Sequence, residues 1–164
     1  MDGLYGIMKI MGGDSMEIQQ IQRVVDAIVL NENGIYNTVY FYGDSNRMQV
    51  MLANIERVYT KYYPMAKVIR TDAESFCNKT IRNMREQIFH TPQCDCALYI
   101  FENMEQIAGM ETTEQQLYGI FDWLLENGRR IIVTGSVPSA SIDKLAPRIR
   151  AQLDGGISFW LKTE

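Results

Sequence analysis

Short apolar runs and longer amphipathic segments alternate along the 164-residue chain. The apolar runs have the length and composition of β-strands, and they lie at residues 38–42, 67–71, 96–101, 130–134 and 157–161. Segments with apolar residues at helical spacing lie at residues 15–30, 47–62, 72–89, 113–127 and 142–145. Strands that alternate with helices imply βαβ crossovers. We therefore expect an α/β fold with a five-stranded parallel sheet and helices on both faces, formed by a single domain over residues 1–164.

Helix-capping residues precede three of the helical segments. They are Asp14 or Ser15, Asp72, and the pair Thr113 and Gln116, which has the spacing of a capping box. The helix that follows Asp72 is expected to pack through Phe76, Ile81 and Met84. These residues predict where helices begin and which faces they bury.

The first apolar run ends at a glycine in the way that strands of phosphate-binding proteins do. In the stretch TVYFYGDSNRMQV at residues 38–50, Gly43 fits the first position of the pattern G-x-x-x-x-G-K-[S/T]. Met48, Gln49 and Val50 then replace the second glycine, the lysine and the hydroxyl residue. The strand and the first glycine of a phosphate-loop pattern are present, but the residues that hold phosphate are absent.

The residues between these positions do not restore the missing chemistry. They are Asp44, Ser45, Asn46 and Arg47. Arg47 could supply a positive charge from a shifted register, yet Asp44 would oppose a polyphosphate in the same loop. We therefore expect neither a bound nucleotide nor any other cofactor.

Composition excludes several classes of protein. The net charge of −4 argues against coating nucleic acid through bulk charge. No apolar run approaches the roughly 20 residues of a membrane span, and the start of the chain lacks a secretory leader. Three cysteines, an odd number, do not make a disulfide framework. These features predict a cytoplasmic protein without a membrane contact.

Four segments of the chain resemble the AAA+ nucleotide-binding domain of the bacterial replication initiator DnaA and its relatives, the DnaA-like regulators and helicase loaders. They are residues 10–25, 39–43, 66–81 and 98–142. The last is the most specific, with a Walker B strand, an apolar-Ala-Gly turn at Ile107–Gly109 and a sensor-1 strand that leads to a proline. The resemblance implies a P-loop NTPase fold. The lid subdomain and helix-turn-helix domain of the initiator lie outside the matched segments, so we expect no sequence-specific binding of duplex DNA by that module.

At the positions that carry function in this family, the chain departs from the family pattern. The Walker B carboxylates fall on Glu102 and Asn103, and an amide cannot accept a proton as a catalytic base does. The sensor-1 position falls near Ser136. In the arginine box, Arg148 and Arg150 match basic positions, whereas the residue that should reach a neighbour's phosphate is Gln152.

The joint loss of these elements favours a non-catalytic, DnaA-like adaptor or regulator. It would act through contacts with a replication initiator, a helicase or a second copy of itself. An alternative is a weak or unusual ATPase that uses Arg47 and Glu102. A further alternative is a module for single-stranded nucleic acid, with contacts from Lys79, Arg82 and Arg85; a solvated helix face balanced by acids explains these residues as well.

Two other groups of residues have ordinary interpretations. His90, Cys94 and Cys96 lack the spacing and the fourth ligand of a zinc site, and Cys96 is expected in the core, so no metal site is predicted. Met48, Met51, Met104 and Met110 are expected to fill gaps in the core; the alternative is that they plug the altered phosphate site or form an adaptable contact surface.

Overall fold

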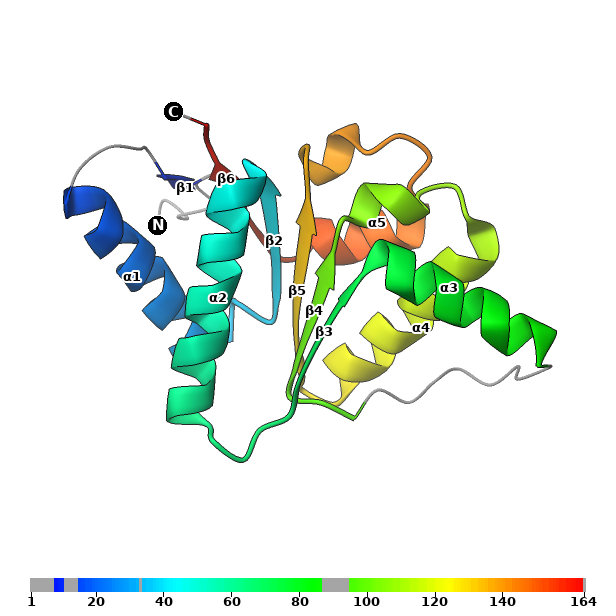
Figure 1. The fold of residues 1–164 in the computed structure, drawn as a ribbon, viewed down its shortest axis with the longest axis horizontal. Coiled ribbons are helices and arrows are strands. Elements are labelled where there is room, and N and C mark those ends of the chain that lie inside the picture. Colours follow the sequence, from blue (N-terminus) through cyan, green and yellow to red (C-terminus); the bar gives the residue numbers. More distant parts are fainter. Residues whose placement is uncertain (1–7, 11–14, 33, 87–94, 164) are drawn as a thin grey trace.

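A computed structural model describes residues 8–10, 15–32, 34–86 and 95–163 (Figure 1). Its elements are β1 (Met8–Ile10), α1 (Ser15–Leu30), β2 (Thr38–Gly43), α2 (Ser45–Tyr62), β3 (Val68–Asp72), α3 (Ala73–Arg85), β4 (Leu98–Glu102), η1 (Met104–Ile107), α4 (Glu111–Glu126), β5 (Arg130–Gly135), η2 (Ser139–Ser141), α5 (Pro147–Asp154) and β6 (Ile157–Leu161). Among these helices, none combines the length and hydrophobicity of a membrane-crossing segment.

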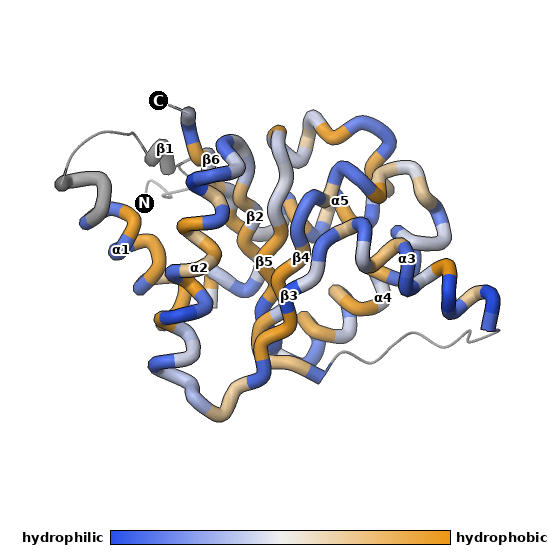
Figure 2. The backbone as a smooth tube through the Cα atoms, viewed as in Figure 1, coloured by the Kyte–Doolittle hydropathy of each residue, from blue (hydrophilic) through white to orange (hydrophobic). Residues whose placement is uncertain are grey.

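The strands form one sheet in the order β1-β6-β2-β5-β4-β3, and every described pair is parallel. The expectation of an α/β fold with a parallel sheet is confirmed, and all five predicted strands are present. The short strand β1, which pairs with β6 at one edge, extends the sheet beyond the predicted five. The central strands are buried along almost their whole length, and Figure 2 shows apolar residues concentrated on β4 and β5.

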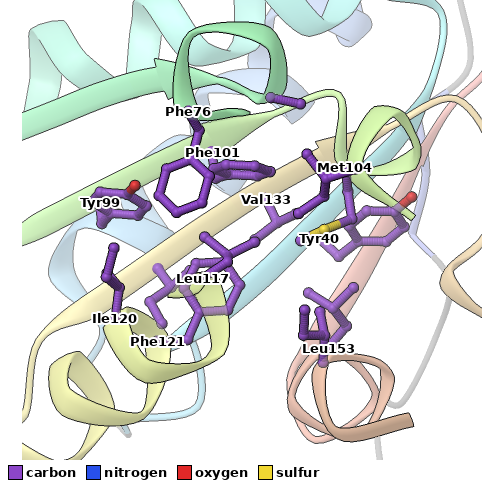
Figure 3. Close-up of a cluster of buried hydrophobic side chains, with 14 of the residues drawn as sticks. Tyr40, Phe76, Tyr99, Phe101, Met104, Leu117, Ile120, Phe121, Val133 and Leu153 are labelled. Atoms are coloured by element: carbon purple, nitrogen blue, oxygen red, sulfur yellow. The ribbon is translucent and has the colours of Figure 1, made fainter. Parts of the chain in front are cut away.

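Helices cover the two faces of the sheet and enclose a separate core on each. On one face α1 and α2 pack against side chains such as Val39 and Phe41, and on the other α3, α4 and α5 pack against Tyr40 and Tyr99. Figure 3 shows the second core, where the Phe76 ring meets Phe101 edge-on with centroids 5.5 Å apart. Side chains of successive strand residues point to opposite faces, so each central strand contributes to both cores.

Three predicted helix starts can be compared with the structure, and one of them differs. The capping box at Thr113 and Gln116 is wrong: α4 begins two residues earlier, at Glu111, and Thr113 is buried within it. Asp72 does cap α3, because its side chain accepts a hydrogen bond from the Ser75 N–H at 2.7 Å. Asp14 lies outside the described residues, and α1 begins at Ser15.

The short helix predicted over residues 142–145 is also wrong. The helix in this region is α5, which begins at Pro147, a residue suited to a first helical position because it has no N–H to satisfy. The preceding Ala146 N–H instead donates to the buried carboxylate of Glu114, whose other oxygen accepts from the Gly109 N–H. Glu114 therefore joins two loops and holds residues 142–146 in a non-helical conformation.

The inner face of α3 is narrower than predicted. Phe76 is buried as expected, but Ile81 and Met84 are 41% and 49% exposed. Their assignment to the inner face is wrong because α3 lies beside the edge of the sheet and packs only through Ala73, Phe76 and Thr80. The helix ends at Arg85, and the predicted last turn at residues 87–89 lies outside the described residues.

Candidate functional site

The connection between β2 and α2 is a single residue. Gly43 ends the strand, Asp44 is the N-cap and Ser45 begins the helix, so residues 45–50 form the first turns of α2. The Asp44 carboxylate accepts a hydrogen bond from the Arg47 N–H at 2.9 Å. A carboxylate therefore occupies the N-terminal end of α2, where a helix would otherwise present N–H groups to an anion.

Gly43 is held against the end of β6. Its φ is 118°, and a Cβ at this position would lie 2.2 Å from the carbonyl oxygen of Leu161. The same carbonyl accepts a hydrogen bond from the Asp44 N–H at 2.8 Å. Glycine is required here because the two strand ends approach closely at a positive φ.

The side chains of residues 45–50 point in different directions. Ser45, Asn46 and Val50 are exposed, whereas Met48 is buried between α2 and the sheet. Met51 lies in the same core, Met104 lies in the core on the opposite face, and Met110 is 45% exposed. Three of the four methionines thus fill the two cores, in agreement with the ordinary interpretation of these residues.

Gln49, which is assigned from the sequence to the lysine position of the phosphate-loop pattern, reaches the end of β4. Its amide N–H donates to Glu102 at 2.9 Å, and its oxygen accepts from Arg70 at 2.6 Å. Arg70 also donates to both Glu102 oxygens, at 2.8 and 3.1 Å, and to Glu56 of α2 at 3.1 Å. One guanidinium therefore joins the two residues that are assigned from the sequence to Walker A and Walker B positions. We call Arg70, Glu102, Gln49 and Glu56 the Arg70 network.

Hydrogen bonds stabilise the charges of this partly buried network, although burial by itself disfavours them. The Glu102 side chain is only 13% exposed. Hydrogen bonds from Arg70 lower the pKa of the Glu102 carboxyl below its usual value, against the opposing effect of burial, and the bond from Gln49 adds to this. The hydrogen bond to Glu102 raises the pKa of Arg70. Glu102 is therefore an ionised partner of Arg70, which is unlike a carboxyl held ready to take up a proton.

Sequence reasoning did not single out Arg70 or Glu56. The sheet register explains why they matter: Arg70 pairs with Ile100 on β4, and Glu102 follows two residues later on the same face. A lone arginine within an apolar strand was the available signal. It became meaningful only once β3 and β4 were known to be neighbours.

Asn103 and Ser136 lie at the ends of neighbouring strands, but the hydrogen bonds described for them do not involve Glu102. Asn103 adopts a left-handed conformation with φ of 64°, and its main-chain N–H donates to Thr134 at 3.2 Å. The Ser136 N–H donates to Glu105 at 3.2 Å. Both side chains are exposed, and neither has a hydrogen bond to Glu102 among the described contacts.

The arginine-box positions on α5 serve different contacts. Arg150 donates to the carbonyl oxygens of Ser139, Ala140 and Ile142 at 2.8 to 3.1 Å, so its guanidinium holds the loop before α5. Arg148 is exposed and lies over the Tyr118 ring at 5.4 Å. Gln152 lines a groove at the amino ends of β2 and β6, which is the opposite end of the sheet from Glu102.

The basic side chains of α3 are on the surface. Lys79, Arg82 and Arg85 are all exposed. Cys96 is buried in the core as expected, whereas His90 and Cys94 lie outside the described residues. No cluster of three metal-ligating His, Cys, Asp or Glu side chains occurs in the described part of the chain.

The parallel sheet, the strand-to-helix step at Gly43 and the acid at the end of β4 define a P-loop-type α/β domain. The sequence model of the bacterial DnaA ATPase domain matches residues 8–159. The chain therefore belongs to the bacterial DnaA ATPase domain family.

Individual relatives agree with this assignment. The chromosomal replication initiator protein DnaA of Deinococcus deserti is 24% identical over 135 residues, which are 80% of this chain and 30% of the relative. Domain III of the Thermotoga maritima DnaA superposes with a TM-score of 0.76 at 16% identity, over 96% of this chain and 66% of that one. A DnaA bound to AMPPCP and single-stranded DNA gives a TM-score of 0.74 at 18% identity, over 94% of this chain and 48% of that one. The chain spans about a third of the length of the curated relative.

Proposed function

We propose that this domain is a non-catalytic, DnaA-like adaptor or regulator that acts through protein contacts in replication initiation or its control, in the cytoplasm. The family assignment supports the link to replication initiation. The observation that carries the non-catalytic part is the Arg70 network, in which residues at the Walker A and Walker B positions bind each other through an arginine.

The residues present do not fit a nucleotide phosphate. A phosphate loop needs several N–H groups that converge on the anion and a lysine beside them. Here a one-residue connection replaces the loop, and the Asp44 carboxylate caps the helix. Gln49 is neutral and is bound to Glu102 and Arg70.

The residues present also do not fit a magnesium ion. In this family a carboxylate at the end of the Walker B strand would face the cation. The Glu102 carboxylate instead accepts three hydrogen bonds, two from Arg70 and one from Gln49. A cation would have to displace a guanidinium that is already paired with this acid, so we derive no catalytic step through a metal.

A domain of this kind can still contact an initiator, a helicase or another copy of itself. A subunit with Gln152 at the finger position would contribute no positive charge to a neighbour's nucleotide. It would therefore block or cap an assembly of active subunits.

A calorimetric titration with AMPPCP and magnesium tests the proposal. We expect no heat of binding at millimolar ligand, while the AMPPCP-binding DnaA relative provides the positive control. The double variant Gln49→Lys with Arg70→Gln should also give no heat of binding, because residues 45–50 would still be helical. Saturable binding by the unmodified domain would refute the proposal and favour the alternative of a weak ATPase. Binding by the double variant alone would show that the side chains, and not the missing loop, prevent binding.

Binding of single-stranded nucleic acid is a second candidate function, favoured by the exposed Lys79, Arg82 and Arg85 on α3. A solved DnaA with the same fold is bound to single-stranded DNA. This function predicts binding of an oligothymidylate that weakens with salt and on reversal of Arg82 and Arg85 to glutamate. No binding at low salt would remove it.

A further inference from the structure

A groove of about 450 Å³ opens beside the edge strand β3, on the face of the sheet that α3 and α4 cover. Its lining includes Ile69 of β3 and Lys67, which precedes β3. It also includes Phe76 and Lys79 of α3 and Ile120 of α4. Lys67, Ile69 and Thr71 lie on one face of β3, whereas the Arg70 guanidinium binds Glu102 and Glu56 on the other face. Arg70 is also one of the residues that line the groove, so the groove and the Arg70 network are adjacent.

The floor of the groove is apolar. Phe76 and Ile120 are 7% and 3% exposed, and Ile69 packs against the same core. Phe76 lies beside Phe101 in the core (Figure 3), and the two rings are in edge-on contact. A small apolar side chain could enter above this floor, but the Phe76 ring is engaged within the core.

The rim of the groove carries positive charge that no described acid neutralises. Lys67 and Lys79 are exposed, and neither has an ion pair with a described residue. The acid that lines the groove, Asp95, is paired with Arg129 at 3.5 Å. Arg70 is bound to Glu102 and Glu56 on the other face. The rim is thus complementary to an anionic ligand.

The outer edge of β3 has no strand partner among the described residues. β3 pairs only with β4 in this part of the chain. The Lys67 carbonyl accepts from the Ala97 N–H at 2.9 Å, so it points toward β4. Because main-chain groups alternate sides along a strand, those of Val68 and Arg70 point to the open edge. They are available to pair with an added strand.

We propose that this groove and the edge of β3 bind an extended segment of a partner protein in which acidic and apolar residues alternate. The segment adds to the sheet beside β3, its apolar side chains cover Ile69 and Ile120, and its acids contact Lys67 and Lys79. The inference deepens the proposed function, on which it rests, by naming the chemistry of a partner.

The same features favour a peptide over single-stranded nucleic acid. Nucleic-acid grooves use exposed aromatic faces on which bases stack. The two aromatic residues that line the groove in the described part of the chain, Phe76 and Tyr99, are buried, and Lys67 and Lys79 are the lysines among its described lining residues. An open strand edge, in contrast, offers the main-chain donors and acceptors that an extended peptide requires.

An array of seven-residue peptides tests this inference. Peptides that alternate Asp or Glu with Val, Ile or Phe are compared with matched arrays carrying Lys or Ser in place of the acids. We expect binding to the acidic array alone. The strongest binder is then labelled and N-methylated at alternate residues. Methyl groups on one set of alternate amides should abolish binding, and those on the other set should leave it unchanged, because only one edge of an added strand pairs with β3.

Protein variants identify the surface by fluorescence anisotropy with the labelled peptide. Lys67→Glu combined with Lys79→Glu should weaken binding about tenfold or more. Arg82→Glu combined with Arg85→Glu makes the same charge change outside the groove lining and should have little effect. Hydrogen exchange at the Val68 and Arg70 amides should slow when the peptide binds. Circular dichroism confirms that each variant is folded.

Several outcomes would overturn the inference. Equal binding to the acidic, basic and neutral arrays would do so, as would a failure of the Lys67 and Lys79 reversals to weaken binding. Binding of an oligothymidylate that depends on these lysines would assign the groove to nucleic acid instead. None of these results requires nucleotide. A flat AMPPCP titration together with silent peptide arrays would therefore reject the docking site alone, whereas saturable AMPPCP binding would reject the proposed function.

Discussion

Positively charged side chains on the two faces of strand β3 have opposite environments. On the α2 face, Arg70 is enclosed by Glu102, Glu56 and Gln49 at 2.6 to 3.1 Å. On the α3 face, Lys67 and Lys79 are exposed and have no ion pair with a described residue. A partly buried charge needs partners within the fold, whereas an exposed charge is solvated and remains available to a ligand. The contrast indicates that the charges of the Arg70 network are paired with one another, whereas those of Lys67 and Lys79 on the α3 face are open to a ligand.

The largest expected effect is a loss of stability at Gly43, where the end of β2 packs closely against the end of β6. Replacing Gly43 by alanine should destabilise the fold by about 3 kcal/mol, because the Cβ meets the Leu161 carbonyl at a positive φ. Gly34 is the matched control: its φ is 67°, but no atom lies within 4 Å of a Cβ there, so alanine should cost only about 1 kcal/mol. Urea unfolding measures both. Equal losses would show that Gly43 is not packed as described.

The next effect compares an arginine from each face. Arg70→Ala should lower the free energy of unfolding by about 2 kcal/mol, because it leaves the Glu102 carboxylate without its cation. Arg82→Ala, on the exposed side of α3, should change stability by less than about 0.5 kcal/mol. Both variants are measured by urea unfolding at neutral pH. A small change in the free energy of unfolding for Arg70→Ala would contradict the view that Arg70 stabilises the fold through its partners in the network.

The smallest effect is a dependence of stability on pH. The pKa of Glu102 is lower in the folded protein than its ordinary value near 4.5, so the unfolded chain binds more protons in this range. The stabilisation from Glu102 is complete above pH 4.5 and is lost as the pH falls through the lower pKa of the folded state. Unfolding of the protein and of Glu102→Gln between pH 7 and 3 should therefore show a steeper acid loss for the unmodified chain. Parallel curves would contradict the lowered pKa.

Local sequence patterns predicted the elements better than the contacts between them. All five expected strands are present, because apolar runs of strand length signal burial on both faces of a parallel sheet. Asp72 was correctly expected to cap α3. The capping box at Thr113 failed because α4 already begins at Glu111. The carboxylate in its first turn, Glu114, accepts from the distant Ala146 N–H, a partner that local spacing does not reveal.

The candidate site could be predicted only in part. The positions of Gly43, Gln49 and Glu102 followed from a motif and a family resemblance, and the structure brings Gln49 and Glu102 into contact. Arg70 could not be predicted, because its partners lie 14, 21 and 32 residues away and depend on which strands are neighbours. The expected nucleotide-free state remains a prediction, which the AMPPCP titration tests.

The sequence by itself determined the class of fold and the departure of residues 43–50 from the phosphate-loop pattern, because both depend on local runs and spacings. Only the tertiary structure decided which contacts these residues make. The β3–β4 pairing places Arg70 beside Glu102, and the other edge of β3, next to Lys67, has no strand partner among the described residues. A charge acquires its role from the groups that surround it in space, and those groups come from segments that the chain brings together only on folding.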